Sequence, residues 1–297
     1  MGMNYTALRF LMLARKDHGV RFESLLTLGR QTLYLQPSER RALAAEFGAM
    51  PDPQGGGEDA YADGVFRGAL GATTLDSLDV SDYEGATRVH DMNLPSPVAW
   101  DECADTVLDG GALEHVFNFP TALASCMRMV RTGGHLALVT VANNNCGHGF
   151  YQFSPELFFR ALSPQYGFET IRVIAVPHLY PGSELGGIGR WYDVRDPADL
   201  GERVVIMNGR GVSLLVLARK SRHLVPFSPA PQQSDYTVLW KMAGTAGILG
   251  TERTASARLR TTIADSLPVS WLNAVRGVRQ RAASSLFNRK HFRPLPR

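Results

Sequence analysis

Short apolar runs alternate along this chain with stretches whose apolar residues recur at helical spacing. We expect strands at 24–28, 73–80, 86–89, 104–108, 135–141, 168–176 and 212–218. Helices are expected at 38–47, 119–130 and 154–162, the first and the last with Ser38 and Ser154 as N-caps. This alternation is typical of an α/β fold, in which a mostly parallel sheet carries helices on both faces.

The stretches between these elements divide the chain. Residues 49–72 hold two prolines and a glycine triplet and predict a long loop, and 132–134 predict a turn. The last strand ends in Arg219-Lys220 and suits an antiparallel edge. Helix-like stretches follow at 237–249, 252–264 and 270–287. The predicted organisation is an N-terminal segment (1–21), an α/β domain (22–222), a Pro-rich linker (223–236) and a basic helical extension (237–297).

Composition excludes several classes of protein. With 44% hydrophobic and 20% charged residues, the chain has enough apolar material for a full core. Its three cysteines include no CxxC pair, which argues against a disulfide framework and a structural zinc site. No apolar run reaches 18 residues, and the apolar N-terminal stretch carries Arg9 and lacks a cleavage site. We therefore expect a cytoplasmic protein.

Polar residues follow the expected strands where a parallel sheet binds its ligands, at the carboxyl ends. Asp79, Asp91 and Asp109 each end or follow a strand, and Gly110 and Gly111 come directly after the last of them. Carboxylates in this position accept hydrogen bonds from ribose hydroxyls or an amino group, and glycines let the backbone approach a ligand closely. The acids also suit simple turns, which is the alternative for each of them.

Two stretches resemble a known family. "DTVLDGGALEHVF" (105–117) and "ALASCMRMVRTGGHLALVTVANNN" (122–145) are similar to signature elements of S-adenosylmethionine-dependent methyltransferases of the Rossmann-like class. The resemblance runs from about residue 22 to 220, two-thirds of the chain. It implies a Rossmann-like seven-stranded methyltransferase fold with a small helical C-terminal extension, and S-adenosylmethionine as cofactor.

The resemblance also implies roles for particular residues. Asp79 would bind the ribose hydroxyls, and Asp91 with Met92 would lie along the adenine. Asp109, Gly110 and Gly111 would line the methionine end of the cofactor. His115 would stand near the transfer site as a candidate base, the alternative being a partly buried helix residue.

The first strand departs from the family pattern, which places an acid and a loop of three glycines there. Here only Gly29 remains, followed by Arg30 and Gln31. Arg30 or Gln31 would then hold the cofactor's carboxylate, Arg30 through its charged fork. The competing interpretation is a non-catalytic, methyltransferase-like binding or scaffold protein that has lost the cofactor. A nicotinamide-dependent oxidoreductase fits less well, because this loop suits a pyrophosphate poorly.

The loop after the fifth strand is expected to face the acceptor. It holds the candidate substrate ligands Asn143, Asn144, Asn145, Tyr151 and Gln152. These side chains suit a small-molecule or glycan-like acceptor. His148, between two glycines, is the second candidate base, with a turn before the next helix as the alternative. No histidine or acid here has metal-ligand spacing, so we expect no metal site.

The net charge of +3 is unevenly distributed. Residues 252–297 carry ten Lys and Arg against two acids, a net charge of +8, and the rest of the chain carries −5. Trp271, Leu272, Val275 and Val278 share one face at helical spacing. The extension would therefore contact an anionic membrane or a phosphate, or pack on the acidic body. No motif supports sequence-specific binding to nucleic acid.

Overall fold

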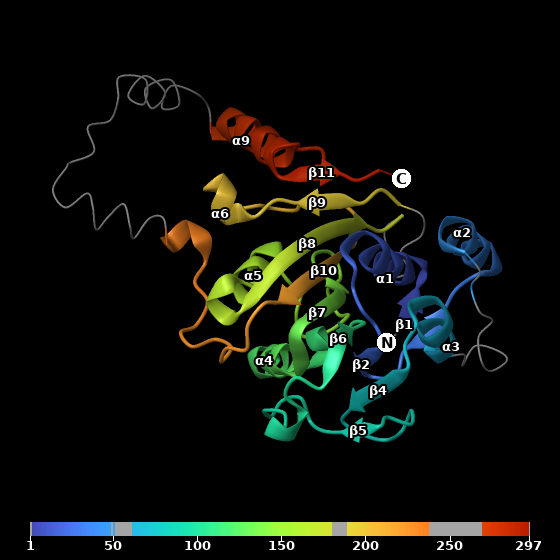
Figure 1. The fold of residues 1–297 in the computed structure, drawn as a ribbon. Helices are drawn as coiled ribbons and strands as arrows, with labels where there is room; N and C mark the ends of the chain where they lie inside the picture. Colours follow the sequence, from blue (N-terminus) through green and yellow to red (C-terminus); the bar gives the residue numbers. More distant parts are fainter. Residues whose placement is uncertain (1, 49, 51–60, 180–188, 238–268, 297) are drawn as a thin grey trace.

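The computed structural model describes residues 2–48, 50, 61–179, 189–237 and 269–296. Within them, nine strands form one sheet in the order β11-β9-β8-β10-β7-β6-β2-β4-β5 (Figure 1). They are β2 (Ser24–Leu28), β4 (Thr74–Asp79), β5 (Arg88–Val89), β6 (Ala104–Asp109), β7 (Val130–Val141), β8 (Phe168–Pro177), β9 (Tyr192–Val194), β10 (Val212–Lys220) and β11 (Phe292–Pro294). A separate pair joins β1 (Gly2–Asn4) in parallel with β3 (Thr32–Tyr34).

The pairing of these strands confirms the predicted fold class. From β5 through β4, β2 and β6 to β7, neighbouring strands are parallel. The chain starts at the central β2, moves out to one side and then to the other, as in a doubly wound Rossmann-like sheet. β10 lies antiparallel between β7 and β8, and β9 and β11 extend the sheet beyond the expected seven strands.

Helices cover both faces of the sheet. The described residues form the helices α1 (Tyr5–His18), α2 (Pro37–Phe47), α3 (Asp63–Val65), η1 (Phe66–Leu70), η2 (Val98–Trp100), η3 (Leu113–His115), α4 (Phe119–Met129), α5 (Pro155–Ala161), η4 (Pro164–Tyr166), α6 (Pro197–Leu200) and α9 (Val269–Ala283). One core contains α1 and η1, and the other contains α4 and α5. Alternate residues of β10 enter the two cores: Leu214 packs in the core with α4 and α5, and Leu215 packs in the core with α1. Because both of its faces are covered, this strand is apolar along most of its length.

Several expectations about local structure are wrong. β10 is antiparallel as expected but is an inner strand, because it pairs with β7 on one side and with β8 on the other. Lys220 at its end is buried and donates a hydrogen bond to the carbonyl of Val130 (2.7 Å). Residues 63–70, expected in a loop, are helical, and 132–134, expected as a turn, lie inside β7. The predicted helices at 237–249 and 252–264 lie outside the described residues, apart from 237.

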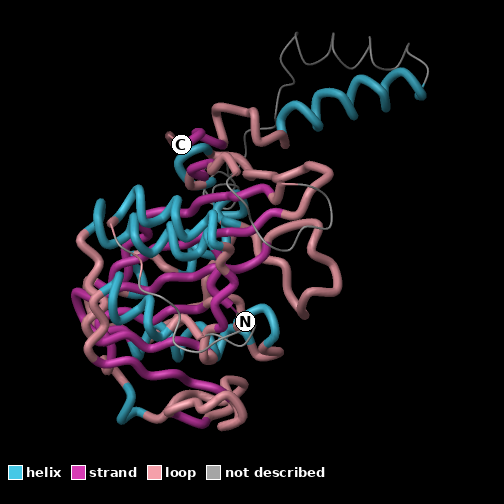
Figure 2. Tube along the Cα trace, turned by 90° about the vertical axis from the view of Figure 1, so that its right-hand side faces the viewer, coloured by secondary structure: helices cyan, strands magenta, loops and turns pink. Residues whose placement is uncertain are grey.

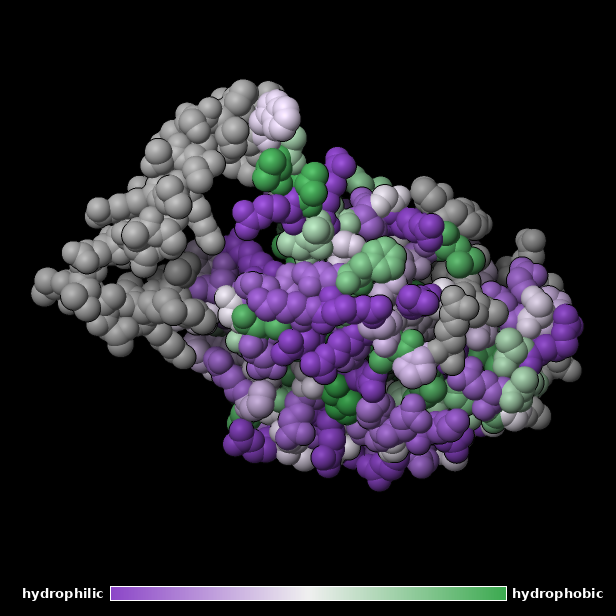
Figure 3. Space-filling model, turned by 90° about the horizontal axis from the view of Figure 1, so that it is seen from above, coloured by the Kyte–Doolittle hydropathy of each residue, from purple (hydrophilic) through white to green (hydrophobic). Residues whose placement is uncertain are grey.

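The basic C-terminal extension contributes to the structure in two ways. β11 pairs with β9 at the edge of the main sheet, whereas α9 projects from the body (Figure 2). Trp271, Val275 and Val278 on α9 are exposed, while most of the face seen in Figure 3 is hydrophilic. No helix among the described residues is long and apolar enough to cross a membrane. Contact with an anionic membrane or a phosphate stays a prediction.

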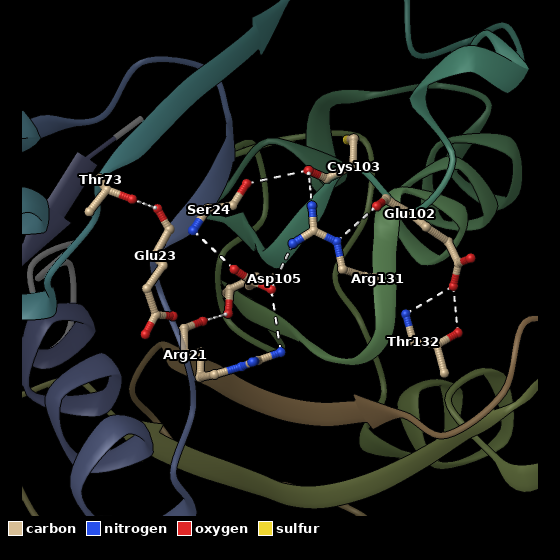
Figure 4. Close-up of polar contacts among 10 residues, drawn as sticks. Arg21, Glu23, Ser24, Thr73, Glu102, Cys103, Asp105, Arg131 and Thr132 are labelled. Atoms are coloured by element: carbon tan, nitrogen blue, oxygen red, sulfur yellow. Dashed lines mark hydrogen bonds and ion pairs between the residues drawn. The ribbon is translucent and has the colours of Figure 1, made fainter.

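A polar network ties the amino ends of the central strands together (Figure 4). Asp105, at the start of β6, is 7% exposed and accepts a hydrogen bond from the backbone N–H of Ser24 in β2 (3.2 Å). Arg131 of β7 pairs with the same carboxylate at 2.9 Å and donates to the carbonyl of Cys103 at 3.2 Å. One carboxylate therefore holds three parallel strands in register at the end opposite to the ligand-binding edge.

We expect Asp105→Ala to lower the free energy of unfolding by about 2–3 kcal/mol, because it leaves a buried N–H and a guanidinium without their charged acceptor. Urea denaturation followed by circular dichroism measures this loss. Asp82→Ala, at an exposed loop position, is the matched control and should change stability by less than about 0.5 kcal/mol. Equal effects of the two substitutions would show that the network does not stabilise the sheet.

Candidate functional site

A cavity of about 440 Å³ opens at the carboxyl ends of the central strands. Its walls come from β1, β3, the turn after β6, the second half of β7, the loop that follows β7, and β10. The residues that line it are Gly2, Asn4, Tyr34, Gly110, Gly111, Glu114, His115, Val139, Thr140, Val141, His148 and Ser213. It lies where an open parallel sheet binds ligands.

Two buried carboxylates stand at this edge of the sheet. Asp109 ends β6, is fully buried, and accepts a hydrogen bond from the N–H of Ala112 (2.7 Å) through Oδ1. Its Oδ2 has no hydrogen-bond partner among the described residues. Burial, and then the negative charge of nearby Glu114, raise the pKa of Asp109 from 3.8 to about 8. The site thus holds a carboxyl group whose ionised form the surrounding protein does not stabilise.

Glu114 connects this acid to the two histidines. It is 1% exposed, and burial raises the pKa of its carboxyl group above the ordinary value. Its Oε2 accepts a hydrogen bond from the Thr140 hydroxyl (2.9 Å), and its Oε1 lies 3.7 Å from Nε2 of His148. The imidazole rings of His115 and His148 are 5.2 Å apart. The two candidate bases therefore lie side by side, although 33 positions separate them in the sequence.

The end of β2 is filled by side chains. Gly29 has a φ of +68°, and the buried Gln31 turns back so that its Nε2 donates to the carbonyl of Leu28 (2.7 Å). The Oε1 of Gln31 has no hydrogen-bond partner within the described part of the chain and lies against Gly110, where an added Cβ would come within 2.2 Å of it. The Met3 side chain of β1 would be 2.6 Å from the same Cβ. A side chain at position 110 would therefore force the flexible ends of Gln31 and Met3 to move.

Arg30 points away from the cavity. Its guanidinium pairs with Asp63 at 2.8 Å, donates to the carbonyl of Glu84 at 3.3 Å, and stacks over the ring of Tyr61 at 3.8 Å. It thus bridges the loop after β4 and the start of α3. The predicted role of Arg30 in holding a cofactor carboxylate has no support in these contacts.

The residues expected along the ribose and adenine lie apart from the cavity. Asp79 ends β4 and accepts a hydrogen bond from the N–H of Val80 (2.6 Å). Asp91 is exposed, and hydrogen bonds from Asn93 hold the pKa of its carboxyl group below the ordinary value. Met92 is 8% exposed and belongs to the core. The structure places these three on the β4 and β5 side of the ligand-binding edge.

The polar residues after β7 mainly contact the protein itself. Asn144 donates to the carbonyls of Asn208 and Arg210, and Asn143 to that of Ile206, so both hold the segment before β10. The N–H of Asn145 donates to Oε1 of Gln152, and the Tyr151 hydroxyl donates to the carbonyl of Phe117. Asn143 and Gln152 line a different cavity of about 330 Å³. Substrate binding by this set stays a prediction.

The cavity also contains residues that the sequence analysis did not select. Glu114 lies inside the quoted "LEHV" stretch, and its neighbours there are the only signal that could have identified it. Thr140 and Ser213 lie within strands and read as ordinary core positions. The wall built by β1 had no signal, because three residues are too few to show a period.

Comparisons with known proteins are limited to structural similarity. No protein-family model matches the sequence, and no curated protein matches it significantly. A SAM-dependent methyltransferase from Thermotoga maritima covers 73% of this chain and 89% of its own, with 16% identity and a TM-score of 0.38. The 1,6-didemethyltoxoflavin-N1-methyltransferase of Burkholderia thailandensis covers 72% and 77%, with 13% identity and a TM-score of 0.34.

A third solved structure has a different activity. The branched-chain polyamine synthase of Thermus thermophilus covers 76% of this chain and 56% of its own, with 12% identity and a TM-score of 0.36. At this level of similarity none of the three assigns an activity to the chain. Function therefore has to be argued from the site.

Proposed function

We propose that this protein transfers a methyl group from S-adenosylmethionine to a small-molecule acceptor. The observation that carries the proposal is the pair of buried carboxylates, Asp109 and Glu114, beside a cavity at the ligand-binding edge of a Rossmann-like sheet. Burying a carboxylate is costly unless a positive charge or hydrogen bonds compensate it. A ligand that brings positive charge would complete this site.

The charge of the site favours one class of cofactor. S-adenosylmethionine carries a sulfonium and an ammonium group at its methionine end, and both are positive. A nicotinamide dinucleotide would bring an anionic pyrophosphate toward two buried carboxylates, which like charges oppose. The orphaned oxygen Oδ2 of Asp109 is an acceptor and would suit the ammonium group.

The remaining residues of the cavity have proposed roles in orienting the acceptor. When bound, the sulfonium supplies an already activated methyl group, so the protein has mainly to align the acceptor and remove a proton. Burial, and then the neighbouring His148, lower the pKa of His115 below 6.5. His115 is therefore neutral at pH 7 and able to accept that proton. A glycan-like acceptor stays a narrower prediction.

The adenosine half of the cofactor would lie toward Asp79 and Asp91, beyond the cavity. Next to Gly29, the side chain of Arg30 binds Asp63 and that of Gln31 binds the carbonyl of Leu28. Side chains that fill this loop are what the non-catalytic alternative predicts. Binding of the cofactor separates the two interpretations, because only the enzyme needs it.

We expect the purified protein to bind S-adenosylmethionine and S-adenosylhomocysteine with micromolar affinity in calorimetric titrations run in EDTA. Asp79→Ala should weaken binding at least about tenfold, because it removes a carboxylate from the proposed ribose site. A tenfold loss corresponds to roughly 1.4 kcal/mol of binding free energy. Asp82→Ala, three residues further along in an exposed loop, is the control and should bind like the wild type. No heat and no thermal shift at millimolar ligand would support the non-catalytic alternative.

A further inference from the structure

Three potential metal ligands meet at the wall of the cavity. One ligand atom from each of Glu114, His115 and His148 lies within 4.8 Å of the other two. The distance from Oε1 of Glu114 to Nε2 of His148 is 3.7 Å. Donor atoms around a tetrahedral zinc ion at about 2.1 Å are about 3.4 Å apart. The two imidazoles are exposed, so their side chains are free of the close packing that would hold them at the longer separation.

The buried carboxylate is oriented for this purpose. The Thr140 hydroxyl donates to Oε2 of Glu114 at 2.9 Å, which leaves Oε1 on the side of His148. Metal ligands are commonly held by such an outer hydrogen bond.

Backbone contacts fix the loop that carries His148. The N–H groups of Phe150 and Tyr151 both donate to the carbonyl of Glu114, at 2.8 and 3.2 Å. The N–H of His148 itself donates to the carbonyl of Asn145 at 3.1 Å. A Cβ on Gly149 would lie 2.8 Å from the carbonyl of Glu114, so the loop approaches η3 closely. These contacts bring His148 over a residue that is 34 positions away.

We propose that Glu114, His115 and His148 bind a divalent transition-metal ion, with Zn²⁺ the first candidate. Two histidines and one glutamate are a zinc ligand set that leaves a coordination position open, and the same set suits other first-row metals. The open position faces the cavity and would take an oxygen donor from a bound ligand. The metal site does not rest on the proposed methyl transfer, and the two roles of His115 exclude one another, because a metal-bound imidazole cannot also accept the proton of the acceptor.

The competing explanation is an ion pair between a protonated His148 and Glu114. Their 3.7 Å separation is too long for a hydrogen bond and suits either explanation. The chain offers a matched comparison, because His223 lies 3.8 Å from the carboxylate of Glu102. At that position the third group is not a second histidine but the amine of Lys220, 3.3 Å from Nδ1 of His223. The positive charge of a lysine ammonium repels a metal ion, so we expect no metal to bind there.

The test is titration of the full chain with Zn²⁺, and separately with Co²⁺, after treatment with EDTA and removal of the chelator. We expect one equivalent of either metal to bind with micromolar or tighter affinity, and Co²⁺ to develop visible absorption bands without a thiolate charge-transfer band. His148→Ala and His115→Ala should each weaken binding about 100-fold, since even the loss of an outer-shell partner typically costs 10- to 100-fold.

Two control variants make the result specific. His223→Ala should bind metal like the wild type, and so should Cys146→Ser, which removes an exposed thiol close to His148 in the sequence. Metal binding that survives in His148→Ala, or that disappears in Cys146→Ser, would overturn the proposal, as would no binding at all. His148 is exposed on a loop, so its loss should not prevent folding. Because the cofactor titrations are run in EDTA, failure of one proposal is distinguishable from failure of the other.

Discussion

Asp109→Asn is expected to be more stable than the wild type, with a much larger gain at pH 8.5 than at pH 5.5 and almost none at pH 4. The pKa of Asp109 is about 8 in the folded protein, raised from 3.8 mainly by burial. Between these two values the folded state holds a proton that the unfolded state has released. The free energy of unfolding contributed by this group therefore falls as the pH rises from about 4 to about 8.

Asparagine removes this dependence while keeping an acceptor oxygen for the N–H of Ala112. Each unit of pKa shift that the substitution removes is worth about 1.4 kcal/mol, so the gain at pH 8.5 should be at least that large. Urea denaturation of both proteins at these pH values measures it. Asp82→Asn, at an exposed position, should follow the wild type at each of them. Parallel pH profiles for wild type and Asp109→Asn would contradict the raised pKa.

The same substitution should weaken binding of S-adenosylmethionine about tenfold or more at pH 8, because it removes the charge that the ligand would balance. In the wild type, affinity should rise between pH 6.5 and 8 as Asp109 ionises, whereas the affinity of the variant should stay constant. Calorimetric titration across this range gives both trends. A more stable variant that binds more weakly would identify Asp109 as a residue retained for binding, since functional sites often reduce stability.

The central strands were predictable from their apolar and β-branched residues, a signal that is clearer in β2 ("SLLTL") than in β6 ("ADTVLD"), where Asp105 and Thr106 interrupt the apolar run. β2 has the predicted limits of 24–28, and β6 extends the prediction by one residue, to Asp109. Such runs arise because strands covered on both faces have no solvent side. β10 was misplaced because its charged end suggested an edge, whereas the stem and amine of Lys220 are buried and hydrogen-bonded.

The N-terminal part was less predictable for two different reasons. α1 carries ordinary helix signals, with Asn4 accepting a hydrogen bond from the N–H of Ala7 (3.0 Å), basic residues in the last turn and Gly19 as the C-cap. Its apolar residues also resemble those of a leader peptide, and this resemblance hides the helix signals. β1 and β3 have three residues each and depend on pairing with each other, which no local pattern reports.

Only part of the candidate site was predictable, because the sequence shows residue types but not which residues the fold brings together. His115 and His148 were selected by residue type, and the structure brings them together at the cavity. Glu114 was not selected, because a charged residue is rarely fully buried and its burial depends on the loop that closes over it. Asp79 and Asp91 lie at strand ends as expected, but strand order alone does not show which strand ends share a cavity.

Gly134→Ala should cost about 3 kcal/mol or more of the free energy of unfolding, the upper range for overpacking in a core. A Cβ at this position would lie 2.4 Å from the carbonyl oxygen of Asp105 and 2.8 Å from that of Arg131. Both are backbone atoms, in β6 and β7, and cannot move aside without separating the strands. If Gly134→Ala prevents folding altogether, the result is a loss of soluble protein and no free energy can be measured. A substitution at the adjacent Gly133 therefore serves as the reference.

Gly133→Ala provides that reference, because the two glycines are adjacent but required for different reasons. Gly133 has a φ of +84° and nothing within 4 Å of its would-be Cβ. Its replacement should therefore cost only about 1–2 kcal/mol, the strain of a left-handed conformation. Urea denaturation of both variants should give the larger loss for Gly134→Ala. Equal losses would mean that backbone strain alone explains the pair. A larger loss at 134 would show that the close approach of β6 and β7, which a turn would not require, is why this glycine is present.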